Sequence, residues 1–149
     1  MIYWQGMEGN GCYVIKVCPN QESVAQAAAH VFVEQFKIAM TRSEKFSVVL
    51  SGGKTPMSTY QLLATEPFKS QIDWLHVHVF WGDERCVPFD DMMSNYGSAQ
   101  RAFLSQVPIP ARQVHPILCT DNPGKSAKEY EANIRKYFNK SRPSFDLVF

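Results

Sequence analysis

Short apolar runs alternate with amphipathic helical patterns along this chain, and the run FSVVL at residues 46–50 is the clearest strand-like segment. Such a compact run is typical of a strand that is buried on both faces of a parallel sheet. Apolar residues recur at helical spacing from the expected cap at Asn20 to about Met40, and Thr55 followed by Pro56 predicts another helix start. Strands that alternate with helices favour right-handed crossovers and a mostly parallel sheet with helices on both faces. The expected fold class is therefore α/β.

The same patterns predict the other elements and a single domain, residues 1–149. The expected strands are residues 12–17, 46–50, 74–81, 114–118 and 145–149. The expected helices run to about Met40, from Thr55 to about Thr65, from Asn95 to about Gln106 behind a Ser94 cap, and from Ser126 to Phe138. Because the last strand reaches the last residue, we expect the sheet to be incomplete at its C-terminal end.

Charge and hydropathy exclude several classes of function. Fifteen Lys and Arg against fourteen Asp and Glu leave a net charge of +1, so the chain lacks the broad basic surface that holds nucleic acid. No apolar run approaches the roughly 20 residues of a membrane span. The first residues, MIYWQGMEGNGC, do not resemble a signal peptide. We therefore expect a cytoplasmic protein without nucleic-acid or membrane partners.

Cysteine and histidine spacing gives no metal motif. No CxxC pair and no zinc-like spacing exists among the four cysteines, Cys12, Cys18, Cys86 and Cys119. Separate thiols in a reducing compartment are the expected state, with a disulfide or a metal site as the alternative. His76 and His78 share one side of an expected strand, but no third ligand is evident, so packing or surface histidines are expected.

The loop after the strand at residues 46–50 has the features of a phosphate site. Gly52 and Gly53 allow the backbone to turn sharply and to bring its N–H groups close to an anion. The following helix start adds partial positive charge, and the hydroxyls of Ser51 and Thr55 can donate hydrogen bonds. Lys54 can add a mobile positive charge. An ordinary capped strand-to-helix turn is the alternative.

Familiar nucleotide-binding and hydrolase motifs do not fit the chain. Gly53 is followed by Lys and Thr as in a P-loop, but position 48, where that motif needs glycine, is valine. Gly6, Gly9 and Gly11 stand in the wrong order for a dinucleotide fingerprint. No GxSxG elbow of the α/β-hydrolase type is present.

A second polar loop, Gly82 to Met93, follows the expected strand at residues 74–81. In an extended backbone Asp83 and Arg85 project to one side while Glu84 points away. An Asp beside an Arg can fix the guanidinium plane and leave its other donors for a phosphate or carboxylate. A solvated charge cluster is the alternative. Asn95, at the next helix start, is close enough in sequence to reach the same cleft.

The segment LSGGKTP, followed about thirty residues later by WGDERCVP and then by SNYG, resembles the 6-phosphogluconolactonase family. The resemblance extends from about Val14 to Phe149. The related glucosamine-6-phosphate deaminases share the Gly-Gly-Thr-Pro loop but have an Asp-Glu-Tyr-like motif where this chain has Asp-Glu-Arg. That difference favours the lactonase.

The resemblance implies a fold of the NagB/RpiA/CoA-transferase type and hydrolysis of 6-phospho-D-glucono-1,5-lactone to 6-phospho-D-gluconate in the oxidative pentose phosphate pathway. It implies a small sugar phosphate as the binding partner and no metal or organic cofactor, and it leaves the oligomeric state open. Gly52, Gly53 and Thr55 then belong to the loop that contacts the sugar phosphate, and Asp83 and Arg85 line the active cleft. In the family the catalytic His lies in a later Asp-Gly-His-Thr-Ala-Ser-like motif, after a strand similar to FDLVF. The chain stops before such a motif, so we expect the N-terminal part of a lactonase without its general base.

Two other classes of function stay open at this point. One is a sugar-phosphate isomerase or deaminase on the same fold. The other is a non-catalytic module that binds phosphosugars.

Overall fold

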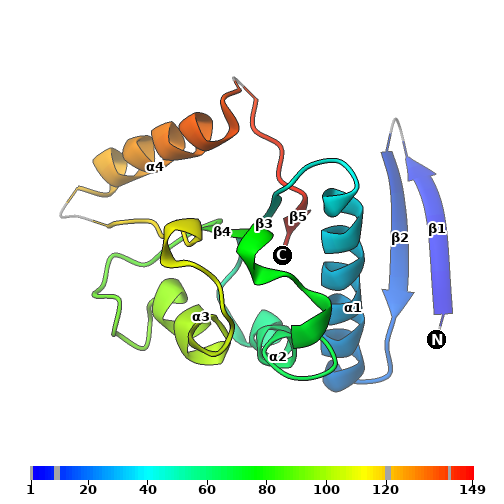
Figure 1. Cartoon of the computed structure of the whole chain (residues 1–149). Coiled ribbons are helices and arrows are strands. Elements are labelled where there is room, and N and C mark those ends of the chain that lie inside the picture. Colours follow the sequence, from blue (N-terminus) through cyan, green and yellow to red (C-terminus); the bar gives the residue numbers. More distant parts are fainter. Residues whose placement is uncertain (1, 9–10, 120–121, 141) are drawn as a thin grey trace.

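The computed structural model describes residues 2–8, 11–119, 122–140 and 142–149. A parallel sheet with helices around it forms the body of the protein, and an N-terminal hairpin forms a sheet of its own (Figure 1).

The main sheet has three strands in the order β4-β3-β5, and both pairings are parallel. They are β3, Phe46–Leu50, β4, Val77–Trp81, and β5, Leu147–Val148. Asp146 fixes β5 beside β3, because its carboxylate accepts hydrogen bonds from the backbone N–H and the hydroxyl of Ser47, at 2.8 and 2.7 Å. The expected mostly parallel sheet is therefore confirmed.

The N-terminal hairpin differs from the expectation. Strand β1, Ile2–Glu8, was not expected, and it pairs antiparallel with β2, Gly11–Val17, in a separate sheet. The expected strand at residues 12–17 therefore exists but does not belong to the parallel sheet. Two neighbouring segments can pair antiparallel across a short connection, whereas parallel pairing needs a long crossover.

Four α-helices are found among the described residues, and none of them is long and apolar enough to cross a membrane. They are α1, Gln21–Met40, α2, Lys54–Leu63, α3, Asn95–Ala102, and α4, Pro123–Phe138. The side chains of Asn20 and Ser94 cap α1 and α3 as expected, because each accepts a hydrogen bond from a backbone N–H in the first turn.

Helices cover both faces of the sheet. Alternate residues of β3, such as Phe46, face the core formed with α1, α2 and α3, where the rings of Phe32 and Phe46 lie 5.1 Å apart. On the other face Phe80 contacts Tyr137 of α4, with ring centroids 5.0 Å apart. The central strand β3 is consequently buried along its whole length, as its apolar sequence predicts.

Residues 114–118 do not form the expected strand. Val114 makes a single parallel bridge to Val79, and the N–H of His115 donates to the Val79 carbonyl at 2.8 Å. The next residue is Pro116, which has no N–H to continue the ladder. The expected strand at residues 74–81 is shorter than predicted. Residues 74–76 form a 3₁₀ turn, and β4 begins at Val77.

A histidine pair beneath α4 predicts acid sensitivity. His78 Nδ1 lies 3.2 Å from His115 Nε2. Burial, and then the charges of His115, Lys45 and Arg112, lower the pKa of His78 to about 4, and burial also lowers the pKa of His115. The unfolded chain therefore binds more protons than the folded one, and stability is lost as the pH falls from about 6.5 towards 4.

We expect the melting midpoint to be about 2–4 °C lower at pH 5 than at pH 7, measured by circular dichroism. His78→Gln removes one of the two imidazoles and should reduce that difference. Equal midpoints at the two pH values would contradict this prediction.

Candidate functional site

The loops that follow β3 and β4 begin side by side. The last residues of the two strands, Leu50 and Trp81, are paired in register, and the N–H of Gly82 donates to the Leu50 carbonyl at 3.0 Å. The carboxyl end of β5 lies at the same edge, because the Ser51 hydroxyl donates to the Phe149 carbonyl at 2.6 Å. Ligands of open α/β sheets bind at this edge.

Asn95, the first residue of α3, connects the two polar loops. Its side-chain amide donates to the backbone carbonyl and to the carboxylate of Asp83, at 3.0 and 3.2 Å. Gly52 approaches the same amide so closely that a methyl group at position 52 would overlap it. Asn95 is only 4% exposed. The Gly-Gly loop, the Asp-Glu-Arg loop and the start of α3 therefore meet at one buried side chain.

Asp83 and Arg85 lie on the outer side of this junction. Arg85 Nε is 3.8 Å from Asp83 Oδ2, and Arg85 Nη1 donates to the Met93 carbonyl at 3.3 Å. The two side chains are 66% and 45% exposed, respectively. The guanidinium is thus oriented by two partners while a large part of it faces solvent, where it can bind an anion.

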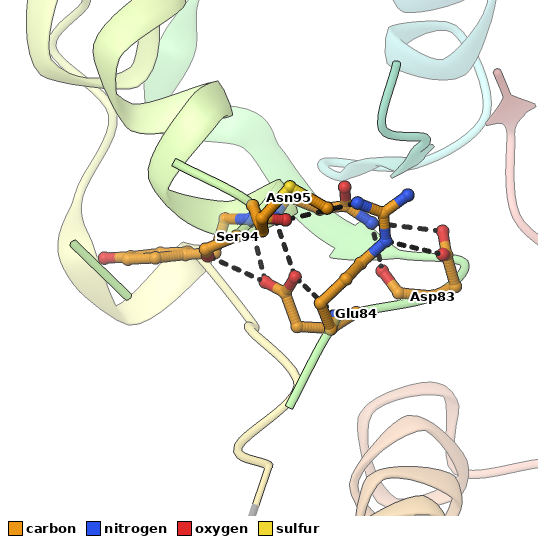
Figure 2. A network of polar contacts seen from close by, with 7 residues as sticks. Asp83, Glu84, Ser94 and Asn95 are labelled. Carbon is orange, nitrogen blue, oxygen red and sulfur yellow. Dashed lines mark hydrogen bonds and ion pairs between the residues drawn. The ribbon is translucent and has the colours of Figure 1, made fainter. Parts of the chain in front are cut away.

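Glu84, to which the sequence assigned no role, lies at the start of α3 (Figure 2). Its Oε1 accepts from the N–H of Asn95 at 2.7 Å, and its Oε2 accepts from the N–H of Tyr96 at 2.8 Å. A carboxylate is favourable there, because the first N–H groups of a helix have no partner within the helix. The one local signal for this contact was the strong cap at Ser94, ten residues further on.

In the Gly-Gly loop, the residues nearest to solvent are Gly53, Lys54 and Thr55, all exposed. Helix α2 begins at Lys54 with Gly53 as its N-cap. Thr55, at which we expected the helix to start, therefore lies inside the first turn and does not cap the helix. Gly53 has a φ of 99°, a conformation that favours glycine, and the space where a side chain would project is open. The uncapped N–H groups of this helix start are suited to bind an anion.

Ser51, at the inner end of the loop, is tied into the fold. Its hydroxyl is the donor to Phe149 described above, and its backbone N–H and carbonyl both pair with the Tyr60 hydroxyl, at 3.1 Å each. Burial raises the pKa of Tyr60 above its ordinary range, so its hydroxyl stays protonated as a donor. Ser51 was predicted to donate its hydroxyl hydrogen to a phosphate, but this hydrogen is already donated to the Phe149 carbonyl.

A cavity of about 530 Å³ lies on the other side of Asp83 and Glu84, between their loop and α4. No residue of the Gly-Gly loop lines it. The candidate site is therefore the region where the three segments converge at Asn95, and it is not defined by this cavity. Tyr130, which also lines the cavity, fixes α4 to the sheet by accepting from the Trp81 N–H at 2.8 Å, and burial raises the pKa of Tyr130 to about 12.

Two of the four cysteines are joined, contrary to our expectation of separate thiols. Cys86 and Cys119 form a disulfide and both line the cavity, whereas Cys18 is free. The sequence could not show this pairing because 33 positions separate the two residues. Among the described residues, no three His, Cys, Asp or Glu side chains converge to hold a metal ion.

The model of the family described as glucosamine-6-phosphate isomerases/6-phosphogluconolactonase matches residues 19–149. The chain belongs to this family. It is 33% identical over 138 residues to the 6-phosphogluconolactonase of Nostoc sp., covering 90% of this chain and 56% of that protein. It is 34% identical over 110 residues to the Haemophilus influenzae 6-phosphogluconolactonase, covering 74% of this chain and 47% of the relative.

Solved structures agree with the family assignment. The 6-phosphogluconolactonase from Trypanosoma cruzi superposes with a TM-score of 0.76 at 30% identity, over 89% of this chain and 55% of that one. The Thermotoga maritima 6-phosphogluconolactonase gives 0.72 at 29% identity, over 83% and 53%. A glucosamine-6-phosphate deaminase of the NagB superfamily, at 18% identity and a TM-score of 0.70, shares the fold. The chain spans about half the length of these proteins.

The two glycines of the loop give this family member a matched pair of variants. Gly52→Ala is expected to cost about 1–3 kcal/mol of stability, because its methyl group would displace the buried Asn95 amide. Gly53→Ala meets no atom, and its cost of about 1–3 kcal/mol arises from the backbone conformation alone, a φ of 99° with a ψ of 169° that is nearly confined to glycine. Urea unfolding measures both costs.

The side-chain amide resonances of Asn95 distinguish the two variants. They should shift in Gly52→Ala and stay in place in Gly53→Ala. Unmoved Asn95 resonances in Gly52→Ala would show that the loop and Asn95 are not in contact.

Proposed function

We propose that the protein hydrolyses 6-phospho-D-glucono-1,5-lactone to 6-phospho-D-gluconate, and that the described site binds and orients this sugar phosphate. The observation that carries the proposal is the meeting of the Gly-Gly loop with the Asp-Glu-Arg loop at Asn95. The relatives named 6-phosphogluconolactonase support it.

The exposed groups divide into an anion site and an orienting site. Gly53, Lys54 and Thr55 offer the N–H groups and partial positive charge of a helix start to the phosphate. The guanidinium of Arg85 is held by Asp83 and is directed by a second bond to the Met93 carbonyl. A phosphate anchored away from the reacting carbonyl supplies binding energy that orients the lactone.

The reaction needs a water, a base and stabilisation of negative charge. Water attacks the lactone carbonyl while the base takes its proton, and the carbonyl oxygen becomes negatively charged. Collapse of this intermediate breaks the bond to the ring oxygen, which takes up a proton. The resemblance implies that the base follows a strand similar to FDLVF, and β5 ends at the sheet edge beside the Gly-Gly loop. We assign no base among the residues that the structure describes.

A location follows from the substrate. A sugar phosphate carries charge that makes crossing a bilayer very costly. The enzyme must therefore share a compartment with its substrate, and we propose that this compartment is the cytoplasm.

Two measurements test the function. Calorimetry measures binding of 6-phosphogluconate to this chain. A hydrolysis assay, corrected for spontaneous opening of the lactone, compares this chain with any longer product of the same gene. Tight binding together with hydrolysis by the longer product supports the proposal. Release of ammonia from glucosamine 6-phosphate, without lactone hydrolysis, would assign the deaminase function instead.

A further inference from the structure

Glu84 has both of its carboxylate oxygens fully engaged. Oε1 accepts from the N–H groups of Asn95 and Arg85, at 2.7 and 2.8 Å. Oε2 accepts from the N–H of Tyr96 at 2.8 Å and from the hydroxyl of Ser94 at 3.2 Å. Figure 2 shows the carboxylate between its own loop and the start of α3. One side chain thus joins two segments about ten residues apart in sequence.

These bonds complete the N-terminus of α3. The Ser94 hydroxyl oxygen accepts from the Gly97 N–H at 3.0 Å, and Glu84 supplies acceptors for the N–H groups of Asn95 and Tyr96. A helix start has N–H groups without partners within the helix and partial positive charge, so a carboxylate, which has two acceptor oxygens, suits it well. Charge-assisted hydrogen bonds of this kind are about twice as strong as neutral ones.

The consequence reaches the candidate site through Asn95. Glu84 fixes the backbone of Asn95, and the Asn95 side chain then bonds Asp83 and packs on Gly52. Glu84 also bonds the N–H of Arg85 directly. The positions of the Asp83–Arg85 pair and of the Gly-Gly loop relative to each other therefore depend on this carboxylate.

We propose that Glu84 is a positioning residue, which holds Asn95 and Arg85 in the geometry that binds the sugar phosphate. The proposal rests on the proposed function for the identity of the ligand and on the hydrogen bonds of Glu84 for the role of the residue. Glu84 acts through its neighbours, because its own oxygens are occupied and it is less exposed than Asp83 and Arg85.

The test compares Glu84→Gln with Asp90→Asn in the 149-residue chain. Glu84→Gln keeps the shape of the side chain but replaces one acceptor oxygen by an NH₂ group, which cannot accept from an N–H. Asp90 is an exposed acid of the same loop, so Asp90→Asn removes the same charge outside the network. Calorimetry measures the affinity for 6-phosphogluconate, and circular dichroism confirms that each variant is folded at the temperature used.

We expect Glu84→Gln to weaken 6-phosphogluconate binding about tenfold while Asp90→Asn changes it less than twofold. In the same samples the Asn95 side-chain amide resonances should shift only in Glu84→Gln. A residue that merely stabilises α3 would lower the melting midpoint and leave the affinity of the folded protein unchanged. Unchanged affinity in folded Glu84→Gln therefore overturns the proposal.

If Glu84→Gln does not fold, Glu84→Asp keeps both acceptor oxygens but shortens their reach, and the same two readouts apply to it. If the unsubstituted chain does not bind 6-phosphogluconate, the proposed function fails, and the Asn95 resonances alone judge the role of Glu84. A shift in Glu84→Gln that is absent from Asp90→Asn then supports positioning, and unshifted resonances refute it.

Discussion

Replacing Arg85 by alanine is expected to weaken 6-phosphogluconate binding by about 2–4 kcal/mol, which corresponds to roughly 30- to 1,000-fold. The guanidinium is held by Asp83 and by the Met93 carbonyl, and a large part of it faces solvent at the sheet edge. Truncation removes this oriented cation and leaves the Asp83 carboxylate without its ion-pair partner. The remaining negative charge would repel an anionic ligand.

Calorimetry with two comparison variants isolates this effect. Arg42→Ala removes an exposed arginine just beyond α1 and should leave the affinity unchanged. Arg85→Lys keeps the charge but loses the planar fork, so we expect an intermediate affinity. If Arg85→Ala binds 6-phosphogluconate as tightly as the unsubstituted chain does, Arg85 does not belong to the binding site.

The sheet edge was predictable because it depends on local pattern and on one topological rule. The FSVVL run and its glycine-rich end specify where β3 stops, and the parallel sheet brings the ends of β3 and β4 together. The pairing of Asp83 with Arg85 follows from their separation of two residues. The strand pattern and this rule therefore suffice to place the Gly-Gly and Asp-Glu-Arg loops side by side.

Contacts between side chains and distant backbone were not predictable in the same way. Glu84 binds the start of α3 because the first N–H groups of that helix lie within reach of its carboxylate. No rule of sequence spacing predicts this contact. Pro116 ended the expected strand at residues 114–118, and the partner of β2 was the adjacent segment β1. For Glu84 and β2 the deciding partner lies outside the pattern that was used for the prediction. Pro116 lies within the predicted segment, and its missing N–H was visible in the sequence but was not given its weight.

Reduction of the disulfide between Cys86 and Cys119 is expected to lower the free energy of unfolding by roughly 3–4 kcal/mol. The bond closes a loop with a sequence separation of 33, and its loss returns conformational entropy to the unfolded chain. A dithiol reductant supplies two electrons and two protons and itself becomes a disulfide, so both cysteines end as thiols. For a protein of this size the melting midpoint should fall by about 10 °C.

The same reduction should weaken ligand binding, because Cys86 directly follows Arg85 and tethers its loop to the segment before α4.

The double variant Cys86→Ser/Cys119→Ser should melt like the reduced protein and be insensitive to dithiothreitol, whereas Cys18→Ser should keep the full response because Cys18 is free. Alkylation before reduction, followed by mass spectrometry, reports how many of the four cysteines are bonded. Identical melting midpoints with and without the reductant, in a sample shown to be oxidised, would mean that this tether contributes nothing to stability. In that case the Arg85 loop would be held by its hydrogen bonds and ion pair, among them those of Glu84, Asn95 and the Met93 carbonyl.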